Sequence, residues 1–275
     1  MAAHSNSFSL LLRAEDVPRA PSWVRDRRRV VLLHGWLQDS SSWLMTAHRL
    51  RRRYGHSVLL LDWLHHGRSG SPASASALSA SALLAQLRAS LEHVGWTGAD
   101  HADGRLTLAG CSLGGALAML YTSAFDADVD RLVLVAPAGF DEPWHRLSHA
   151  GRVAARALVR ATAAVGAAPR ARGTPLGRLV AHAHLISDTP RYGNARDWFD
   201  TAAARRKPTL LVCAAFDELH RADAWARCRA DDRTFRLRTL AVNHALLCQH
   251  LDCLRLDLDA AAWHAEGAAE PHSRL

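Results

Sequence analysis

The segment Leu106–Leu120 most constrains the fold of this chain, because it joins a short apolar run to a glycine-rich turn and then to a helical stretch. Its sequence, LTLAGCSLGGALAML, contains the pattern G-x-S-x-G at Gly110–Gly114. In the order strand, turn, helix, this pattern places the serine on a sharp turn, where Gly110 and Gly114 let backbone segments pass closely. The helix start offers free N–H groups to a developing oxyanion. We therefore expect Ser112 to be a nucleophile rather than a surface serine.

Short apolar runs alternate with stretches of helical spacing along much of the remaining chain. Such an alternation predicts an α/β fold, with a mostly parallel central sheet flanked by helices. The predicted strands are Phe8–Leu12, Val30–Leu33, Ser57–Leu61, Leu106–Leu108, Arg131–Val135, Thr209–Ala215 and Phe235–Leu240. The predicted helices outside the segment above are Trp43–Arg53, Leu78–Val94, Ala222–Ala230 and Leu246–Trp263.

The strand pattern is interrupted between Gly139 and Arg206, where only Ala- and Arg-rich helical pieces occur. This interruption predicts a small helical cap at residues 139–206, inserted into a core of residues 1–138 and 207–265. Residues 266–275 are expected to form a polar tail.

Composition excludes several functional classes. The net charge of +8 is the excess of 34 basic over 26 acidic residues, and Lys207 is the only lysine. Because the basic triplets are scattered without aromatic residues between them, we expect no nucleic-acid partner. No segment approaches the length of a membrane span. The five cysteines include no C-x-x-C pair, so we expect free thiols and a cytoplasmic protein, with a short organellar transit sequence as the alternative.

No metal site is expected. His182 and His184 could ligate a metal, but they are two apart in the predicted helical piece Leu176–Ile186 and are expected to point to different sides. Cys111, beside Ser112, is expected to be buried and inert.

A serine hydroxyl needs a general base, most often a histidine held by a carboxylate. The order serine, acid, histidine is the one typical of a serine on a strand-to-helix turn. Asp217 follows the predicted strand Thr209–Ala215, and His244 follows Phe235–Leu240 in a loop before the last helix. These residues are our candidate acid and base. The alternatives are Glu218 and Asp141 as acids and His250 as base.

An oxyanion needs two donors aimed at one point. We expect the backbone N–H groups of Leu113 and Trp36 to supply them. Gly35 permits the close approach of the Trp36 turn to the serine, and His34 is expected to stabilise that loop rather than to do chemistry.

Taken together, these motifs resemble those of the α/β-hydrolase superfamily, in its cap-bearing branch. The resemblance covers about Phe8 to Trp263 and rests on His34–Trp36 (HGW), Asp62–Ser69 (DWLHHGRS), Gly110–Gly115, the strand end at Asp217 and the loop at His244. The start HGW and the short cap look most like serine hydrolase-like proteins and C–C-bond hydrolases of the meta-cleavage product type. The chain departs from the common family pattern at His65, Ala214 and Asn243, where family members often have glycine. These changes are expected to affect turn geometry more than chemistry.

The resemblance and the residues together predict a cofactor-independent serine hydrolase that cleaves a small carboxylic ester through an acyl-enzyme on Ser112. Two alternatives stay open. One is hydrolysis of a C–C bond in a vinylogous diketone acid, and the other is a non-catalytic module that binds a small ligand. We expect a small-molecule acyl substrate as the only partner, and a monomer or homodimer.

Overall fold

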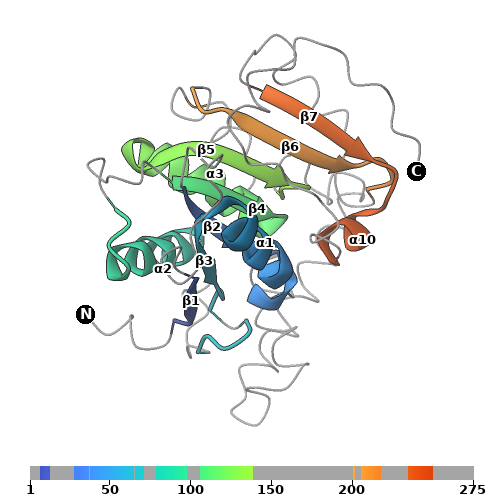
Figure 1. Cartoon of the computed structure of the whole chain (residues 1–275). Helices are drawn as coiled ribbons and strands as arrows, with labels where there is room; N and C mark the ends of the chain where they lie inside the picture. The colour runs from blue at the N-terminus through green and yellow to red at the C-terminus, as the bar shows by residue number, and fades with distance from the viewer. Residues whose placement is uncertain are drawn as a thin grey trace, which may run out of the picture.

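The computed structural model describes residues 7–12, 28–36, 38–64, 66–70, 79–97, 106–138, 201, 206–217 and 235–249 (Figure 1). The described strands are β1 (Ser9–Leu12), β2 (Arg29–Leu33), β3 (Ser57–Leu61), β4 (Leu106–Cys111), β5 (Val129–Val135), β6 (Thr209–Ala214) and β7 (Phe235–Leu240). The described α-helices are α1 (Leu44–Tyr54), α2 (Ala80–His93), α3 (Leu113–Ala124) and α10 (His244–Gln249). Short 3-10 turns at Ser40–Trp43 and Asp126–Asp128 precede α1 and β5.

All seven strands join one sheet in the order β1-β3-β2-β4-β5-β6-β7. Only β1 is antiparallel to its neighbour; every other pair is parallel. Parallel strands bury both faces, which is why β2 and β4 are buried at every residue and read as continuous apolar runs. The sheet therefore has the mostly parallel arrangement that the sequence predicts.

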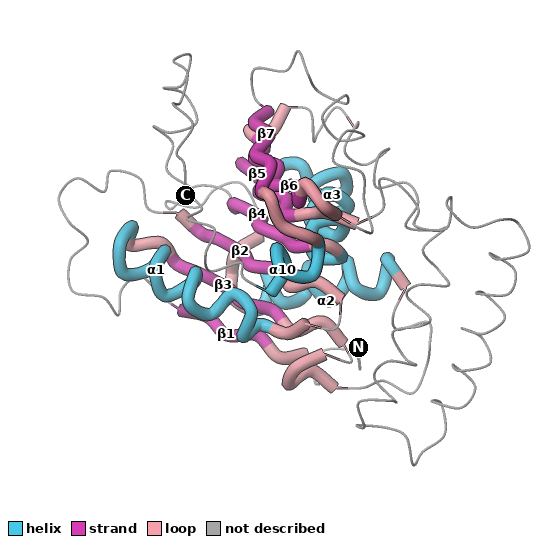
Figure 2. Tube along the Cα trace, turned by 90° about the vertical axis from the view of Figure 1, so that its right-hand side faces the viewer, coloured by secondary structure: helices cyan, strands magenta, loops and turns pink. Residues whose placement is uncertain are grey.

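Successive side chains of each strand point to opposite faces of the sheet. Val31 and Leu33 of β2 belong to a core shared with α2 and α3. Val30 and Leu32 belong to a second core, shared with α1 and with Leu247 and Cys248 of α10. Helices thus cover both faces, in three layers (Figure 2).

The carboxyl ends of β2, β4, β6 and β7 carry the segments that matter for function. The parallel register aligns Leu33 with Gly110, and Ala214 with Leu240, so these strands end at a common edge. Active sites of parallel α/β sheets form at this edge.

The predicted elements within the described residues are confirmed, with shifted ends. β4 runs on to Cys111 instead of ending at Leu108, because it pairs with both β2 and β5 as far as the turn. The prediction that His244 lies in a loop is wrong, because His244 is the first residue of α10. The Asn243 side chain accepts the N–H of Leu246 at 2.8 Å, so Asn243 caps this helix.

Several predictions lie outside the described residues. These are almost all of the cap at 139–206, the helix Ala222–Ala230, the tail, and the last helix beyond Gln249. The division into core and cap therefore remains a proposal.

Candidate active site

Ser112 lies between the last residue of β4 and the first residue of α3, in a strained backbone conformation with φ 49° and ψ −113°. An L-residue at positive φ of this kind costs roughly 1–3 kcal/mol and persists only when its surroundings hold it. Here the N–H of Ser112 donates to the Val135 carbonyl at 2.8 Å, and its own carbonyl accepts from Ala138 at 2.9 Å. β5 and the segment after it therefore hold the turn.

The two motif glycines are required for packing at this turn. A Cβ on Gly110 would overlap the backbone of Gly114, and a Cβ on Gly114 would overlap the carbonyl of Leu33 in β2. Strand, turn and helix thus pack backbone against backbone, which fixes the position of Ser112.

The turn after β2 touches Ser112 directly. A Cβ on Gly35 would lie 2.7 Å from Gln38 Oε1 and 3.2 Å from the Ser112 Cβ, so a larger residue here would have to displace the Gln38 side chain and crowd the serine. Trp36 follows in the same turn. The second predicted donor, the N–H of Leu113, belongs to the first residue of α3 and so has no acceptor inside the helix. Both predicted oxyanion donors therefore belong to segments that flank the serine.

His34 is a buried part of the loop after β2. Its Nε2 accepts the N–H of Trp63 at 3.1 Å, which places its proton on Nδ1, and Nδ1 donates to the Gly35 carbonyl at 2.7 Å. The Trp63 indole N–H donates back to the His34 carbonyl at 3.0 Å. With both ring nitrogens engaged, His34 is a neutral residue that fixes the loop.

Gln38 is a site residue that the sequence analysis missed. Its Oε1 accepts the Gly35 N–H at 2.8 Å, and its Nε2 donates to the Cys248 carbonyl at 2.6 Å. One amide side chain thus ties the turn beside Ser112 to α10. The two partners are 210 positions apart for the second bond, so no local pattern could have indicated it.

Asp217 and His244 come together at the ends of β6 and β7. Backbone hydrogen bonds beyond the strands, from Ala215 to Leu240 and from Phe216 to Val242, hold these two ends side by side. His244 Nδ1 lies 2.9 Å from Asp217 Oδ2, and the side chains are only 9% and 4% exposed. A carboxylate in this position orients an imidazole and leaves Nε2 for the reacting group.

The His244 Nε2 faces a sulfur atom. It lies 3.6 Å from Cys248 Sγ, one turn further along α10. Among the described residues, the structure has no hydrogen bond between His244 and the Ser112 hydroxyl. Asp217 and His244 are thus brought into contact. The structure connects His244 to the serine turn through Cys248, which contacts Cys111, the residue before Ser112.

The groups around His244 favour its protonated, charged form. Burial alone would lower the pKa of His244, but the hydrogen bonds to Asp217 and Cys248 outweigh it and raise the pKa to about 10. For Cys248, the S–H of Cys111 and the nearby imidazole lower the thiol pKa. The two groups therefore favour an imidazolium beside a thiolate.

The alternative acids Glu218 and Asp141 and the alternative base His250 lie outside the described residues, and His65 does as well. Within the described ranges, no three His, Cys, Asp or Glu side chains cluster as metal ligands would. In the same ranges, no helix combines the length and apolar character needed to cross a bilayer.

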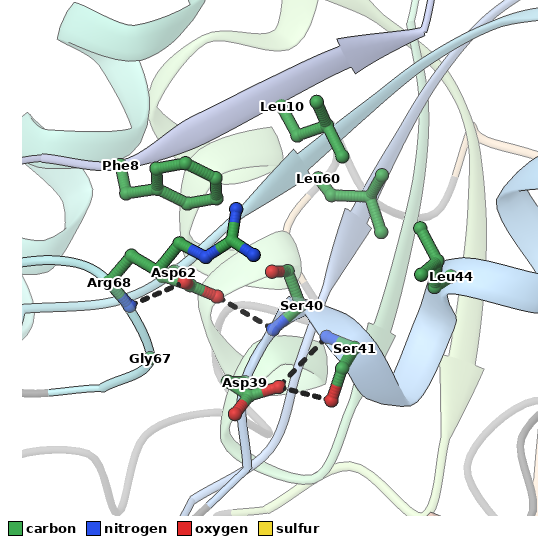
Figure 3. Close-up of a pocket in the computed structure, with 10 residues that line it drawn as sticks. All are labelled: Phe8, Leu10, Asp39, Ser40, Ser41, Leu44, Leu60, Asp62, Gly67 and Arg68. Atoms are coloured by element: carbon green, nitrogen blue, oxygen red, sulfur yellow. Dashed lines mark hydrogen bonds between the residues drawn. The ribbon is translucent and has the colours of Figure 1, made fainter.

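A separate pocket of about 290 Å³ opens between β1, β3 and the loop before α1 (Figure 3). Arg68 lies over the Phe8 ring, and next to it Asp62 accepts the N–H groups of Ser40 and Arg68 at 2.6 and 2.8 Å. None of Ser112, Asp217 and His244 lines this pocket, so it is distinct from the candidate active site.

The protein has a three-layer α/β fold. A serine on a strained strand-to-helix turn and an acid–histidine pair follow the carboxyl ends of its strands. This combination is typical of the class of α/β hydrolases. The model of the alpha/beta hydrolase family matches residues 30–273. The chain therefore belongs to the alpha/beta hydrolase family.

Solved structures agree with this fold at low sequence identity. A hydrolase from Oleispira antarctica has a TM-score of 0.59 and 13% identity, covering 91% of this chain and 92% of that one. A monoacylglycerol lipase from Paleococcus ferrophilus has a TM-score of 0.58 and 16% identity, covering 86% and 90%. An esterase from Exiguobacterium antarcticum has a TM-score of 0.54 and 16% identity, covering 90% and 91%. A comparison with curated protein sequences finds no match.

Proposed function

We propose that the protein is a serine hydrolase that cleaves small carboxylic esters through an acyl-enzyme on Ser112. The observation that carries the proposal is the 2.9 Å contact between Asp217 and His244 beside a serine whose backbone is held at positive φ. Family membership and the similarity to structures titled esterase and monoacylglycerol lipase support the same reaction class.

In the proposed reaction, the Ser112 oxygen attacks the ester carbonyl carbon while His244 Nε2 takes the hydroxyl proton. The carbonyl oxygen becomes an oxyanion and accepts hydrogen bonds from the backbone N–H groups of Trp36 and Leu113. Collapse of this intermediate expels the alcohol, which takes the proton from His244. Water then attacks the acyl carbon, passes a proton to His244, and releases the acid and Ser112.

The resting arrangement sets one condition for this mechanism. His244 must be neutral and its Nε2 must turn from Cys248 toward Ser112 before it can accept a proton. Asp217 favours the productive tautomer, because it accepts the Nδ1 proton and leaves Nε2 as the acceptor.

A fluorophosphonate probe, which labels activated serines, tests the proposal. We expect wild-type protein to be labelled and Ser112→Ala to remain unlabelled, and a series of p-nitrophenyl esters to be hydrolysed. A vinylogous diketone acid in the same series tests C–C-bond hydrolysis, because that alternative uses the same serine.

One observation favours a second function, a module that binds a small ligand without turnover. It is the contact of His244 Nε2 with Cys248 in place of Ser112. If folded wild-type protein resists both the fluorophosphonate and a smaller sulfonyl fluoride from neutral to strongly alkaline pH, the hydrolase proposal is wrong and the binding module replaces it.

A further inference from the structure

Two cysteine side chains are in contact, and one of them belongs to the residue directly before Ser112. Cys111, the last residue of β4, and Cys248, in α10, have their Sγ atoms 2.7 Å apart. At this distance the Cys111 S–H donates toward the Cys248 sulfur, so the two side chains are in direct contact. Both cysteines are free thiols in this structure.

The position of the pair ties it to the site. Cys111 immediately precedes Ser112, and Cys248 Sγ lies 3.6 Å from His244 Nε2. On an α-helix, residues four apart share one face, which is why the His244 and Cys248 side chains contact each other. The Cys248 sulfur therefore contacts His244 Nε2, the nitrogen that has to accept the serine proton in the proposed mechanism.

The two sulfurs have different characters. Cys111 is completely buried, and burial raises its thiol pKa, so it stays protonated and donates toward Cys248. Cys248 is 6% exposed and lies beside the imidazole. A reactive thiolate next to a protonated second thiol is the arrangement from which disulfides form after oxidation.

We propose that Cys111 and Cys248 are an oxidation site that a hydroperoxide closes to a disulfide, and that closure removes the Cys248 thiolate that faces His244 and makes Ser112 more reactive. The second half of this proposal rests on the proposed function, whereas the first half does not. The sequence alone predicts that Cys111 is buried and inert, and its contact with Cys248 is the reason to assign it a role.

The chemistry balances with hydrogen peroxide as oxidant. The Cys248 thiolate attacks one peroxide oxygen, giving a sulfenic acid and hydroxide, which takes the His244 proton to form water. The Cys111 sulfur then attacks the Cys248 sulfur and expels hydroxide, which takes the Cys111 proton. Two thiols and one peroxide become one disulfide and two waters, and His244 is left neutral.

Mass spectrometry of the peroxide-treated full chain tests the disulfide without reference to activity. Trypsin releases Cys111 in peptide 106–131 and Cys248 in peptide 239–255. The second peptide also holds Cys253, so the experiment uses Cys253→Ser protein. We expect these peptides to be linked, with two hydrogens lost, and to separate after dithiothreitol. Two unlinked peptides carrying higher oxidation states would overturn the proposal.

Fluorophosphonate labelling of the same samples tests the effect on Ser112. We expect faster labelling after oxidation, by about tenfold for each unit by which the pKa of His244 falls, and a return to the original rate with dithiothreitol. Cys248→Ala should label quickly and be insensitive to peroxide. Slower labelling of the linked protein would overturn the release of His244.

Cys213 supplies the matched control. It is a free thiol, 3% exposed, at the carboxyl end of β6 near the same site. Cys213→Ser should keep both the peroxide-induced link and the change in labelling. If no sample is labelled in any redox state while the linked peptide forms, the oxidation site stands and the proposed hydrolase function fails.

Discussion

Asp217 and His244 form the residue pair with the clearest chemical meaning, because the carboxylate both orients the imidazole and stabilises its charge. Asp217→Asn keeps the shape but loses the charge and can present an N–H to Nδ1, which favours the wrong tautomer. We expect kcat for ester hydrolysis to fall by about 10⁴-fold with little change in the free energy of unfolding.

The matched control is Asp126→Asn. Asp126 pairs with Lys207 and Arg206 in the turn before β5, at the opposite edge of the sheet. Its replacement should leave kcat unchanged. Equal losses in the two variants would mean that the Asp217 carboxylate has no special role.

The contact between Cys248 and His244 leads to a prediction about how labelling of Ser112 depends on pH. Because Cys248 is one of the groups that raise the pKa of His244 to about 10, its removal should lower that pKa. A base works only when neutral, so wild-type labelling should rise as the pH increases toward 10, and the Cys248→Ala profile should rise at lower pH. Labelling rates measured across the pH range check this, and superimposable profiles would contradict it.

Gln38 links the turn after β2 to α10, two segments that are far apart in the sequence. Gln38→Ala removes both hydrogen bonds and frees the turn to move away from Ser112. Because a displacement of about 1 Å can cost about a hundredfold in rate, we expect kcat to fall by about ten- to a hundredfold.

The companion variant Gln38→Met keeps the side-chain length without either bond. It should lose as much activity as Gln38→Ala, as measured by steady-state hydrolysis of the best ester. Full activity of Gln38→Met would show that packing alone holds the turn.

The elements themselves follow from the sequence wherever local physics decides them. Apolar runs such as Ser57–Leu61 have to be strands buried on both faces, and G-x-S-x-G after one of them predicts the elbow at Ser112. Spacing along the chain cannot indicate the contacts of Gln38 or of Cys111, which join residues 210 and 137 positions apart. The start of α10 could have been read from Asn243, since asparagine is a preferred helix cap.

The whole molecule depends on two cores, one on each face of the sheet. Leu117 of α3 is completely buried in the core shared with α2. Leu117→Ala should lower the free energy of unfolding by about 2–5 kcal/mol, through lost burial and the cavity that remains.

Met45 of α1 is the control, because it is 62% exposed. Met45→Ala should change the free energy of unfolding by less than about 0.5 kcal/mol. Urea denaturation of both variants measures the difference. If the two variants unfold at the same urea concentration, the packing of α3 against the sheet is not what stabilises this face.

The strained backbone of Ser112 also lowers the thermal stability of the protein. Ser112→Gly would relieve roughly 1–3 kcal/mol of strain and give back about 0.4–1 kcal/mol through the greater freedom of the unfolded chain. Calorimetry should therefore find a Tm higher by a few degrees, whereas Ser112→Ala keeps its Cβ and gains nothing. An inactive descendant of this protein, free to drift at this position, would be expected to become the more heat-resistant of the two.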